Sequence, residues 1–263
     1  MEIGMSSACF YPNIDVENSI KIMKSLGFNS GELFINTLSE FEKEFSTIIN
    51  EKRIENNFRI NSIHGFSSFF EPLLFNEYKR RRKDMMKLFK KLCVLGNAIG
   101  AESYTFHGMR LRDKERIKTE LILDIYNEIA YIANESGIKL SQENVSWCIS
   151  SDIEFLNLLK EKCRYPIYFT LDIKQANKAG VDIKKYIDVM GSKMCNYHIN
   201  DYDDENVCLL PGKGKVNYSK IKSYLDDINY KGMGIIEVYS DNYEKLSELT
   251  ESKKILERIY DTL

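Results

Sequence analysis

The chain has 263 residues, of which 43% are hydrophobic and 29% are charged, and its formal net charge is −2. This is enough apolar material for a sizeable core. A nearly neutral chain lacks the positive charge that draws proteins to nucleic acid or to anionic membranes, so we expect neither as a partner.

Short apolar runs alternate along the chain with longer amphipathic ones. This alternation is typical of repeated strand–helix units and a parallel sheet. The predicted strands cover residues 2–6, 31–35, 59–63, 103–106, 138–142, 167–171, 194–197 and 234–236. The predicted helices cover residues 16–26, 39–56, 78–99, 114–136, 152–162, 183–190, 218–228 and 243–260.

Eight such units in about this length indicate the α/β class and a closed (β/α)8 barrel. No linker or low-complexity segment divides the chain, so we expect residues 1–263 to form a single TIM barrel domain. No Gly-x-Gly-x-x-Gly follows the first strand, which argues against the simplest dinucleotide-binding fold.

The N-terminal residues lack the basic and apolar regions of a signal peptide, and no apolar run approaches the roughly 20 residues of a membrane span. The six cysteines are scattered, without Cys-x-x-Cys or zinc-knuckle spacing. A chain of this length needs no disulfide staples. We therefore expect a cytoplasmic protein with reduced thiols and no membrane contact.

Six polar residues come directly after predicted strands, about one strand–helix unit apart. They are His64, His107, Glu143, Asp172, His198 and Glu237. In a barrel the C-terminal ends of all strands meet at one face, where active sites lie. The six side chains should therefore share one cavity.

The chain has three histidines, and all three belong to this set. A single histidine at a strand end is commonly a hydrogen-bonding partner, and a single carboxylate is commonly a helix cap or an ion-pair partner. Six such groups at one barrel mouth are costly unless they are paired or bind a metal. The pattern as a whole favours a metal site.

Glu143, Asp172, His198 and Glu237 together offer three carboxylates and one imidazole. This oxygen-rich set suits one divalent ion of Mn²⁺, Zn²⁺, Co²⁺ or Mg²⁺, with positions left open for substrate oxygens. No cysteine belongs to the set, which argues against a structural zinc site.

At these residues the sequence resembles the sugar phosphate isomerase/epimerase group of the xylose-isomerase-like TIM barrels, which is related to the ketose 3-epimerases and to endonuclease IV. The resemblance covers nearly the whole chain, through short fragments in a specific order. They are Ser62-Ile63-His64-Gly65, Thr105-Phe106-His107-Gly108, Gln142-Glu143-Asn144, Leu171-Asp172-Ile173-Lys174-Gln175-Ala176, His198-Ile199-Asn200-Asp201, Leu210-Pro211-Gly212-Lys213-Gly214 and Ile236-Glu237-Val238-Tyr239.

The resemblance implies a metal-dependent isomerase or epimerase acting on a carbohydrate, with Glu143, Asp172, His198 and Glu237 holding the metal. Glu143 and Glu237 would also transfer the proton as catalytic carboxylates, through a metal-stabilised enediolate. His64 and His107 would orient substrate hydroxyls.

Many epimerases of this group carry a histidine three residues after the metal-binding aspartate, where this chain has Gln175. Glutamine can still bind a sugar hydroxyl, so we retain it as substrate-binding. Lys174 and Lys213 are either phosphate contacts or solvated side chains, and Lys213 is counted here as substrate-binding. Trp147, counted here as substrate-binding, is predicted with Phe66, Phe69 and Phe70 to form an apolar wall for a sugar ring. Phe69 and Phe70 could equally be buried under a loop.

Other interpretations remain open from the residues alone. An AP endonuclease like endonuclease IV uses three zinc ions, but Gln175 replaces one expected ligand and no histidine follows His198. A dehydratase acting on a keto-sugar or an inosose, and a non-catalytic sugar-binding barrel, fit the same scaffold. The helical faces also leave room for a homo-oligomer.

Overall fold

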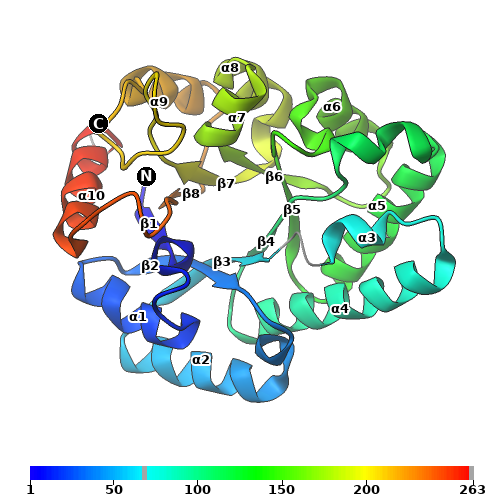
Figure 1. The fold of residues 1–263 in the computed structure, drawn as a ribbon, viewed down its shortest axis with the longest axis horizontal. Helices are drawn as coiled ribbons and strands as arrows, with labels where there is room; N and C mark the ends of the chain where they lie inside the picture. Colours follow the sequence, from blue (N-terminus) through cyan, green and yellow to red (C-terminus); the bar gives the residue numbers. More distant parts are fainter. Residues whose placement is uncertain (67–69, 261–263) are drawn as a thin grey trace.

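A computed structural model describes residues 1–66 and 70–260 of the chain. Eight parallel strands close into a barrel in sequence order, and β1 pairs with β8 to complete the ring (Figure 1). The strands are β1 (Ile3–Ser6), β2 (Ser30–Ile35), β3 (Arg59–Gly65), β4 (Ser103–Phe106), β5 (Lys139–Glu143), β6 (Tyr168–Asp172), β7 (Met194–Ile199) and β8 (Met233–Ile236). The predicted (β/α)8 barrel is confirmed.

Helices surround the barrel, as Figure 1 shows, and their apolar faces cover the outside of the strands. They are α1 (Val16–Ser25), α2 (Lys43–Glu55), α3 (Glu71–Leu74), α4 (Lys79–Ala98), α5 (Thr119–Glu135), α6 (Ile153–Lys162), α7 (Ile173–Ala179), α8 (Ile183–Met190), α9 (Tyr218–Asp227) and α10 (Leu246–Tyr260). Each predicted helix has a counterpart among them.

The predicted helix over 114–136 is wrong in its first turn. Leu111–Arg116 forms a 3-10 helix with no buried residue, and α5 begins only at Thr119. Lys118 between them is extended, with φ −63° and ψ 141°. The charged residues before Thr119 have no apolar stripe to hold them against the barrel, so the continuous helix ends there.

Two short helices, α3 and α7, were not predicted. Helix α7 starts at the end of β6, where the side chain of Asp172 accepts a hydrogen bond from the backbone N–H of Gln175. This cap allows a helix of seven residues to follow the strand without a loop. It also places Lys174 and Gln175 beside the strand ends.

The interior of the barrel is polar for much of its length. Each of the strands β3 to β7 contributes a buried polar residue to it: Ser62, Thr105, Ser141, Thr170 and Asn196. Ser141 Oγ lies 2.7 Å from Thr170 Oγ1, which in turn lies 3.4 Å from Thr105 Oγ1. Buried polar groups need such partners, and this lining supports further polar groups above it.

The described cysteines form no disulfide with one another. Over residues 1–66 and 70–260, none of the helices has both the length and the apolar character needed to cross a bilayer.

Candidate metal and catalytic site

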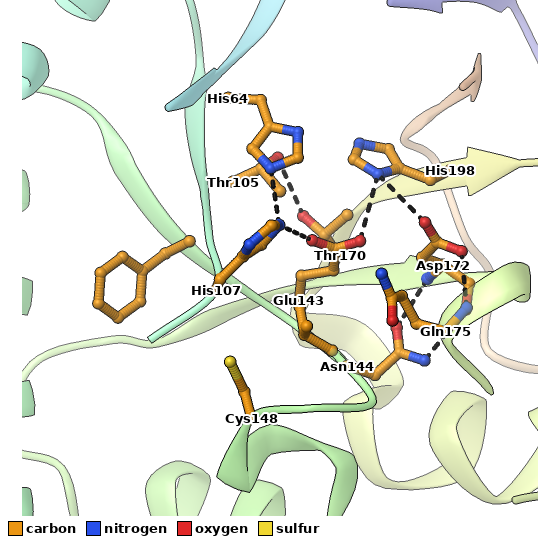
Figure 2. A network of polar contacts seen from close by, with 12 residues as sticks. His64, Thr105, His107, Glu143, Asn144, Cys148, Thr170, Asp172, Gln175 and His198 are labelled. Carbon is orange, nitrogen blue, oxygen red and sulfur yellow. Dashed lines mark hydrogen bonds and ion pairs between the residues drawn. The ribbon is translucent and has the colours of Figure 1, made fainter. Parts of the chain in front are cut away.

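The six predicted side chains converge at the C-terminal end of the barrel. His64 and His198 lie one residue before the ends of β3 and β7, Glu143 and Asp172 end β5 and β6, and His107 and Glu237 follow β4 and β8 directly. Figure 2 shows His64, His107, Glu143, Asp172 and His198 facing a common centre. The predicted convergence of the six side chains at one face of the barrel is confirmed by these positions, and their ligand atoms form groups within 4.8 Å.

Glu143, Asp172, His198 and Glu237 form a four-residue group whose ligand atoms all lie within 4.8 Å of one another. His198 is at its centre. Its Nδ1 lies 3.2 Å from Glu237 Oε2, 3.6 Å from Glu143 Oε1 and 3.9 Å from Asp172 Oδ2. All four residues are buried.

Asp172 is held in one orientation by its neighbours. Its Oδ1 accepts hydrogen bonds from Gln175 N at 3.0 Å and from Asn200 Nδ2 at 3.2 Å. The amide of Asn144 bonds to both the backbone N–H and the backbone carbonyl of Asp172 (Figure 2). These contacts leave Oδ2 directed toward the group and without a hydrogen bond from any residue that the structure describes.

The donor set fits a divalent cation. The three negatively charged carboxylates of Glu143, Asp172 and Glu237 are buried close together. Within residues 1–66 and 70–260, His198 Nδ1 and Asp172 Oδ2 make no hydrogen bond. Like charges in a buried site repel unless a cation lies between them. Carboxylate oxygens with one imidazole nitrogen are suitable ligands for Mn²⁺, Zn²⁺, Co²⁺ or Mg²⁺.

His64 and His107 connect Glu143 to Glu237. Glu143 Oε2 lies 2.7 Å from His107 Nε2, which lies 2.8 Å from His64 Nε2, and His64 Nδ1 lies 3.1 Å from Glu237 Oε1. The two rings thus form a continuous row of polar contacts between the two carboxylates. Together with Glu143 they also make a three-residue group of metal-binding type.

Glu32 belongs to the site and was missed. It lies in the middle of β2, is fully buried, and its Oε1 is 3.1 Å from His198 Nε2 and 3.6 Å from His64 Nδ1. Glu32 lies inside a strand, whereas the predicted site residues all lie at strand ends. Its signal in the sequence is that it is the single charged residue of the strand Ser30–Ile35.

Lys174 is neither solvated nor at the surface, which corrects one of the two readings of this residue. Its side chain is 4% exposed, and Nζ lies 3.5 Å from both Asp172 Oδ2 and Glu237 Oε2. The ammonium also lies 4.8 Å from the centre of the Tyr239 ring. It therefore borders the carboxylate group on the side of β6 and β8.

The charges of the group shift its pKa values in opposite directions. Burial raises the pKa of Asp172 to about 6, against the attraction of Lys174 and with the repulsion of Glu143 and Glu237. Burial also opposes ionisation of Glu143, but His107 and His198 hold the pKa of Glu143 well below its ordinary value. Burial disfavours the charged form of His64, yet Glu237 and Glu32 raise the pKa of His64 to about 10. Against burial, Glu237 and Glu32 also raise the pKa of His198, so without a metal His64 and His198 are the imidazole cations that the carboxylates attract.

A further buried carboxylate, Glu71 of α3, supports His107 from behind. Its Oε2 accepts hydrogen bonds from His107 N at 2.8 Å and from Gly108 N at 3.0 Å, and its Oε1 accepts one from Tyr104. Glu71 therefore fixes the turn that follows β4. No sequence motif pointed to this residue, because it lies outside the strands.

Two of the predicted aromatic residues border the site. The Trp147 ring is 5.7 Å from the His107 ring at 85°, and Trp147 is 38% exposed. Phe66, at 40% exposure, packs near Tyr11 and Phe34. Phe70 is buried against Phe41, so it is a core residue. Phe69 lies outside the described residues.

Gln175 and Lys213 differ in their surroundings. Gln175 is buried beside Asp172, and its Oε1 accepts hydrogen bonds from Ser146 N at 3.0 Å and Ser146 Oγ at 2.8 Å. Lys213 is on the loop after β7 with its side chain 53% exposed, and Nζ lies 3.9 Å from Glu248. The structure thus brings Gln175 to the site, whereas Lys213 pairs on the surface.

Comparisons with known proteins agree with the barrel fold. The family model described as "Xylose isomerase-like TIM barrel" matches residues 20–261. A search of curated proteins gives no match.

Among solved structures, a D-tagatose 3-epimerase-like protein superposes with a TM-score of 0.82 at 19% identity, covering 99% of this chain and 97% of that one. The D-psicose 3-epimerase of Clostridium cellulolyticum, solved with D-tagatose, gives 0.78 at 16% identity, with 99% of each chain covered. The IolI protein with a bound zinc atom gives 0.78 at 17% identity over 100% of both chains. At these identities the likeness shows the shared fold.

Proposed function

Because the chain belongs to the xylose isomerase-like TIM barrel family, we propose that it is a divalent-metal-dependent isomerase or epimerase of a sugar, keto-sugar or sugar derivative. One observation carries the proposal. Asp172 Oδ2 and His198 Nδ1 converge with two further carboxylates at a buried mouth of the barrel, and neither atom makes a hydrogen bond within the described chain. Packing alone does not explain buried polar atoms that make no hydrogen bond, whereas binding of a cation does.

In this proposal Glu143, Asp172, His198 and Glu237 hold one ion. When bound, a divalent cation would draw negative charge from adjacent carbonyl and hydroxyl oxygens and so make the intervening C–H more acidic. Several structural neighbours are sugar epimerases or contain zinc, which supports the assignment without identifying the substrate or the ion.

Glu143 and Glu237 are the proposed proton-transfer groups. They come from different strands, β5 and the end of β8, so they can approach a substrate carbon from two directions. One carboxylate takes the proton from the carbon and the other returns a proton to the opposite face of the same carbon, which inverts the centre. Return of the proton to the neighbouring carbon, with the hydroxyl proton passing to the former carbonyl oxygen, moves the carbonyl instead. Burial keeps water from competing for either step.

The substrate-binding roles of the remaining residues are part of the same proposal. His64 and His107 lie beside the catalytic glutamates and can orient hydroxyls. Trp147 offers a partly exposed apolar face next to His107, and Gln175 lies beside Asp172. A substrate-binding role for Lys213, the cytoplasmic location and a homo-oligomer stay predictions.

The test is a reconstitution screen. Metal-free protein is loaded with Mn²⁺, Zn²⁺, Co²⁺ or Mg²⁺ and mixed in D₂O with ketoses, their phosphates, hydroxypyruvate and inosose. We expect about one ion per chain and deuterium incorporation at a carbon next to a carbonyl, followed by proton NMR. Absence of both metal binding and exchange over the whole panel would refute the proposal.

The same metal-loaded protein, with abasic DNA added to the panel, separates the alternatives. Three zinc ions per chain with cleavage of abasic DNA would indicate the endonuclease function, and loss of water from inosose would indicate a dehydratase. Sugar binding without metal or exchange would indicate a non-catalytic barrel. Gln175 and the net charge of −2 favour the sugar enzyme over the nuclease.

A further inference from the structure

Glu32 is a buried carboxylate in the interior of the barrel, below the proposed metal ligands. It is 0% exposed. Among the residues that the structure describes, the ionisable side chains within ion-pair distance of Glu32 are His198 and His64. A buried carboxylate without a lysine or arginine needs other donors to offset its lost hydration.

Three polar side chains from three strands supply those donors. Glu32 Oε2 accepts hydrogen bonds from Ser62 Oγ at 2.7 Å, Thr105 Oγ1 at 3.0 Å and Asn196 Nδ2 at 3.0 Å. The carboxylate is therefore fixed by β3, β4 and β7. A carboxylate held by three hydrogen bonds has few orientations available, so it can fix the orientation of the side chains that it contacts.

His198 contacts the carboxylate of Glu32 through one ring nitrogen. Its Nε2 lies 3.1 Å from Glu32 Oε1 and 3.2 Å from Glu32 Oε2, close to both oxygens. Nε2 also lies 3.3 Å from Asn196 Nδ2, but that amide donates to Glu32 Oε2, so the two oxygens of Glu32 are the acceptors beside Nε2. A carboxylate accepts hydrogen bonds and cannot donate, which favours a proton on Nε2. In the neutral ring the lone pair is then on Nδ1, which faces Glu143, Asp172 and Glu237.

We propose that Glu32 is a positioning residue for the metal site: it holds His198 as the tautomer protonated at Nε2 and so directs the lone pair of Nδ1 to the cation. The proposal rests on the metal-binding part of the proposed function. Such a carboxylate–histidine–metal arrangement fixes the ring and makes the ligand nitrogen a stronger donor. Glu32, His64, His198 and Glu237 also form a group of metal-binding type. In this proposal the ion lies on the Nδ1 side of His198, so Glu32 acts through His198.

Glu32 also orients His64. His64 Nδ1 lies 3.6 Å from Glu32 Oε1 and 3.1 Å from Glu237 Oε1, and the rings of His64 and His198 are 5.7 Å apart. One buried carboxylate thus contacts both imidazoles that border Glu237. Loss of Glu32 is expected to disturb the metal ligand and its neighbour together.

The first experiment observes the tautomer in the wild-type protein. Protein with ¹⁵N-labelled histidine is loaded with Zn²⁺, which is diamagnetic, and two-bond ¹H–¹⁵N correlation spectra are recorded. We expect zinc on Nδ1 of His198 and a retained proton on Nε2. Zinc on Nε2, or an Nε2 without a proton, would overturn the proposal with no substitution involved.

The second experiment measures Zn²⁺ affinity by calorimetry for Glu32→Gln, which keeps the shape of the side chain and removes its charge. Affinity should fall about 10- to 100-fold, the usual effect of losing an outer partner of a ligand histidine. Glu32→Asp, which withdraws the carboxylate from Nε2, should weaken binding as well and replaces Glu32→Gln if the latter does not fold. Wild-type affinity in the folded variants would contradict the proposal.

Asn127→Ala is the control. Asn127 is a buried polar side chain on α5, outside the barrel, and its described partners are the backbone carbonyl of Leu123 and the backbone N–H of Arg164. This variant should lose stability and keep wild-type zinc affinity. An equal loss of affinity in both variants would mean that Glu32 acts only through general stability.

These readouts are independent of turnover. If no sugar is converted but Zn²⁺ binds on Nδ1 and Glu32→Gln weakens it, the proposed reaction fails and the role of Glu32 stands. If sugars are converted while Glu32→Gln leaves zinc binding and the tautomer unchanged, the role of Glu32 fails alone.

Discussion

The two ends of the barrel both carry many charged side chains, but they organise them in opposite ways. At the N-terminal end, Arg59 bridges Glu2 at 2.6 Å and Glu102 at 3.6 Å, and Lys139 pairs with Glu102 at 3.3 Å. These side chains are 40–57% exposed, so water screens them. At the C-terminal end the carboxylates are buried and face one another.

A cavity of about 940 Å³ opens at the N-terminal end, between residues that include Arg59, Glu102 and Lys139. Size alone would make this cavity the preferred site. Its charged side chains are half-exposed, whereas at the mouth Glu143, Asp172 and Glu237 are buried together with Lys174, His64 and His198. Buried, closely packed ionisable groups, rather than volume, are the reason to place the proposed site at the C-terminal end of this barrel.

The largest expected contrast is in catalysis. Glu143→Gln or Glu237→Gln should each reduce deuterium exchange into the substrate by about 10²- to 10⁴-fold, because each removes a proton-transfer group. The control Glu102→Gln, at the opposite end, should exchange at the wild-type rate. Exchange that persists in both site variants would falsify the assignment of the two glutamates.

The second largest effect is expected when the metal is removed from the C-terminal site. A ligand at 100 times its Kd stabilises a folded protein by about 2.7 kcal/mol, so a chelator should lower Tm and added Mn²⁺ should restore it. Asp172→Asn should lose this metal-dependent rise, since its Oδ2 is one of the proposed ligand atoms. Scanning calorimetry of both proteins with and without Mn²⁺ measures the difference; an equal rise in both would argue against the ligand set.

The pH dependence of metal binding has a defined sign. Burial opposes protonation of His198, but Glu237 and Glu32 raise its pKa well above its ordinary value in the metal-free chain. At neutral pH the ring therefore carries a proton that the cation must displace from Nδ1. Mn²⁺ affinity should rise about tenfold per pH unit for each displaced proton between about pH 6 and 8. Calorimetry in buffers of different ionisation enthalpy counts that proton, and an affinity independent of pH would contradict the expectation.

The smallest effect is expected at the N-terminal end itself. Arg59→Ala removes two half-exposed ion pairs, so the free energy of unfolding should change by about 1 kcal/mol or less. Urea denaturation measures this change, with metal affinity as the second readout. A large loss of metal binding would show that the two ends are coupled, contrary to the comparison.

Much of the fold followed from local patterns. The strand period and the amphipathic helices identified all eight units, because each unit buries one apolar face against its neighbours. The errors lie where the apolar pattern is weak. The charged segment Leu111–Arg116 leaves the predicted helix, and α7 depends on a cap at Asp172 that also serves the site.

The sequence by itself determined which polar side chains lie at the strand ends and that these side chains meet. Parallel strands of a barrel end at one face, so His64, His107, Glu143, Asp172, His198 and Glu237 had to converge. Pairing and orientation were decided only by the tertiary structure. Whether Lys174 is solvated or lies between two carboxylates, and which nitrogen of His198 meets Glu32, depends on distances across the barrel between residues far apart in the chain. Those distances follow from barrel closure and from the register of the strands, neither of which is visible in the residues themselves.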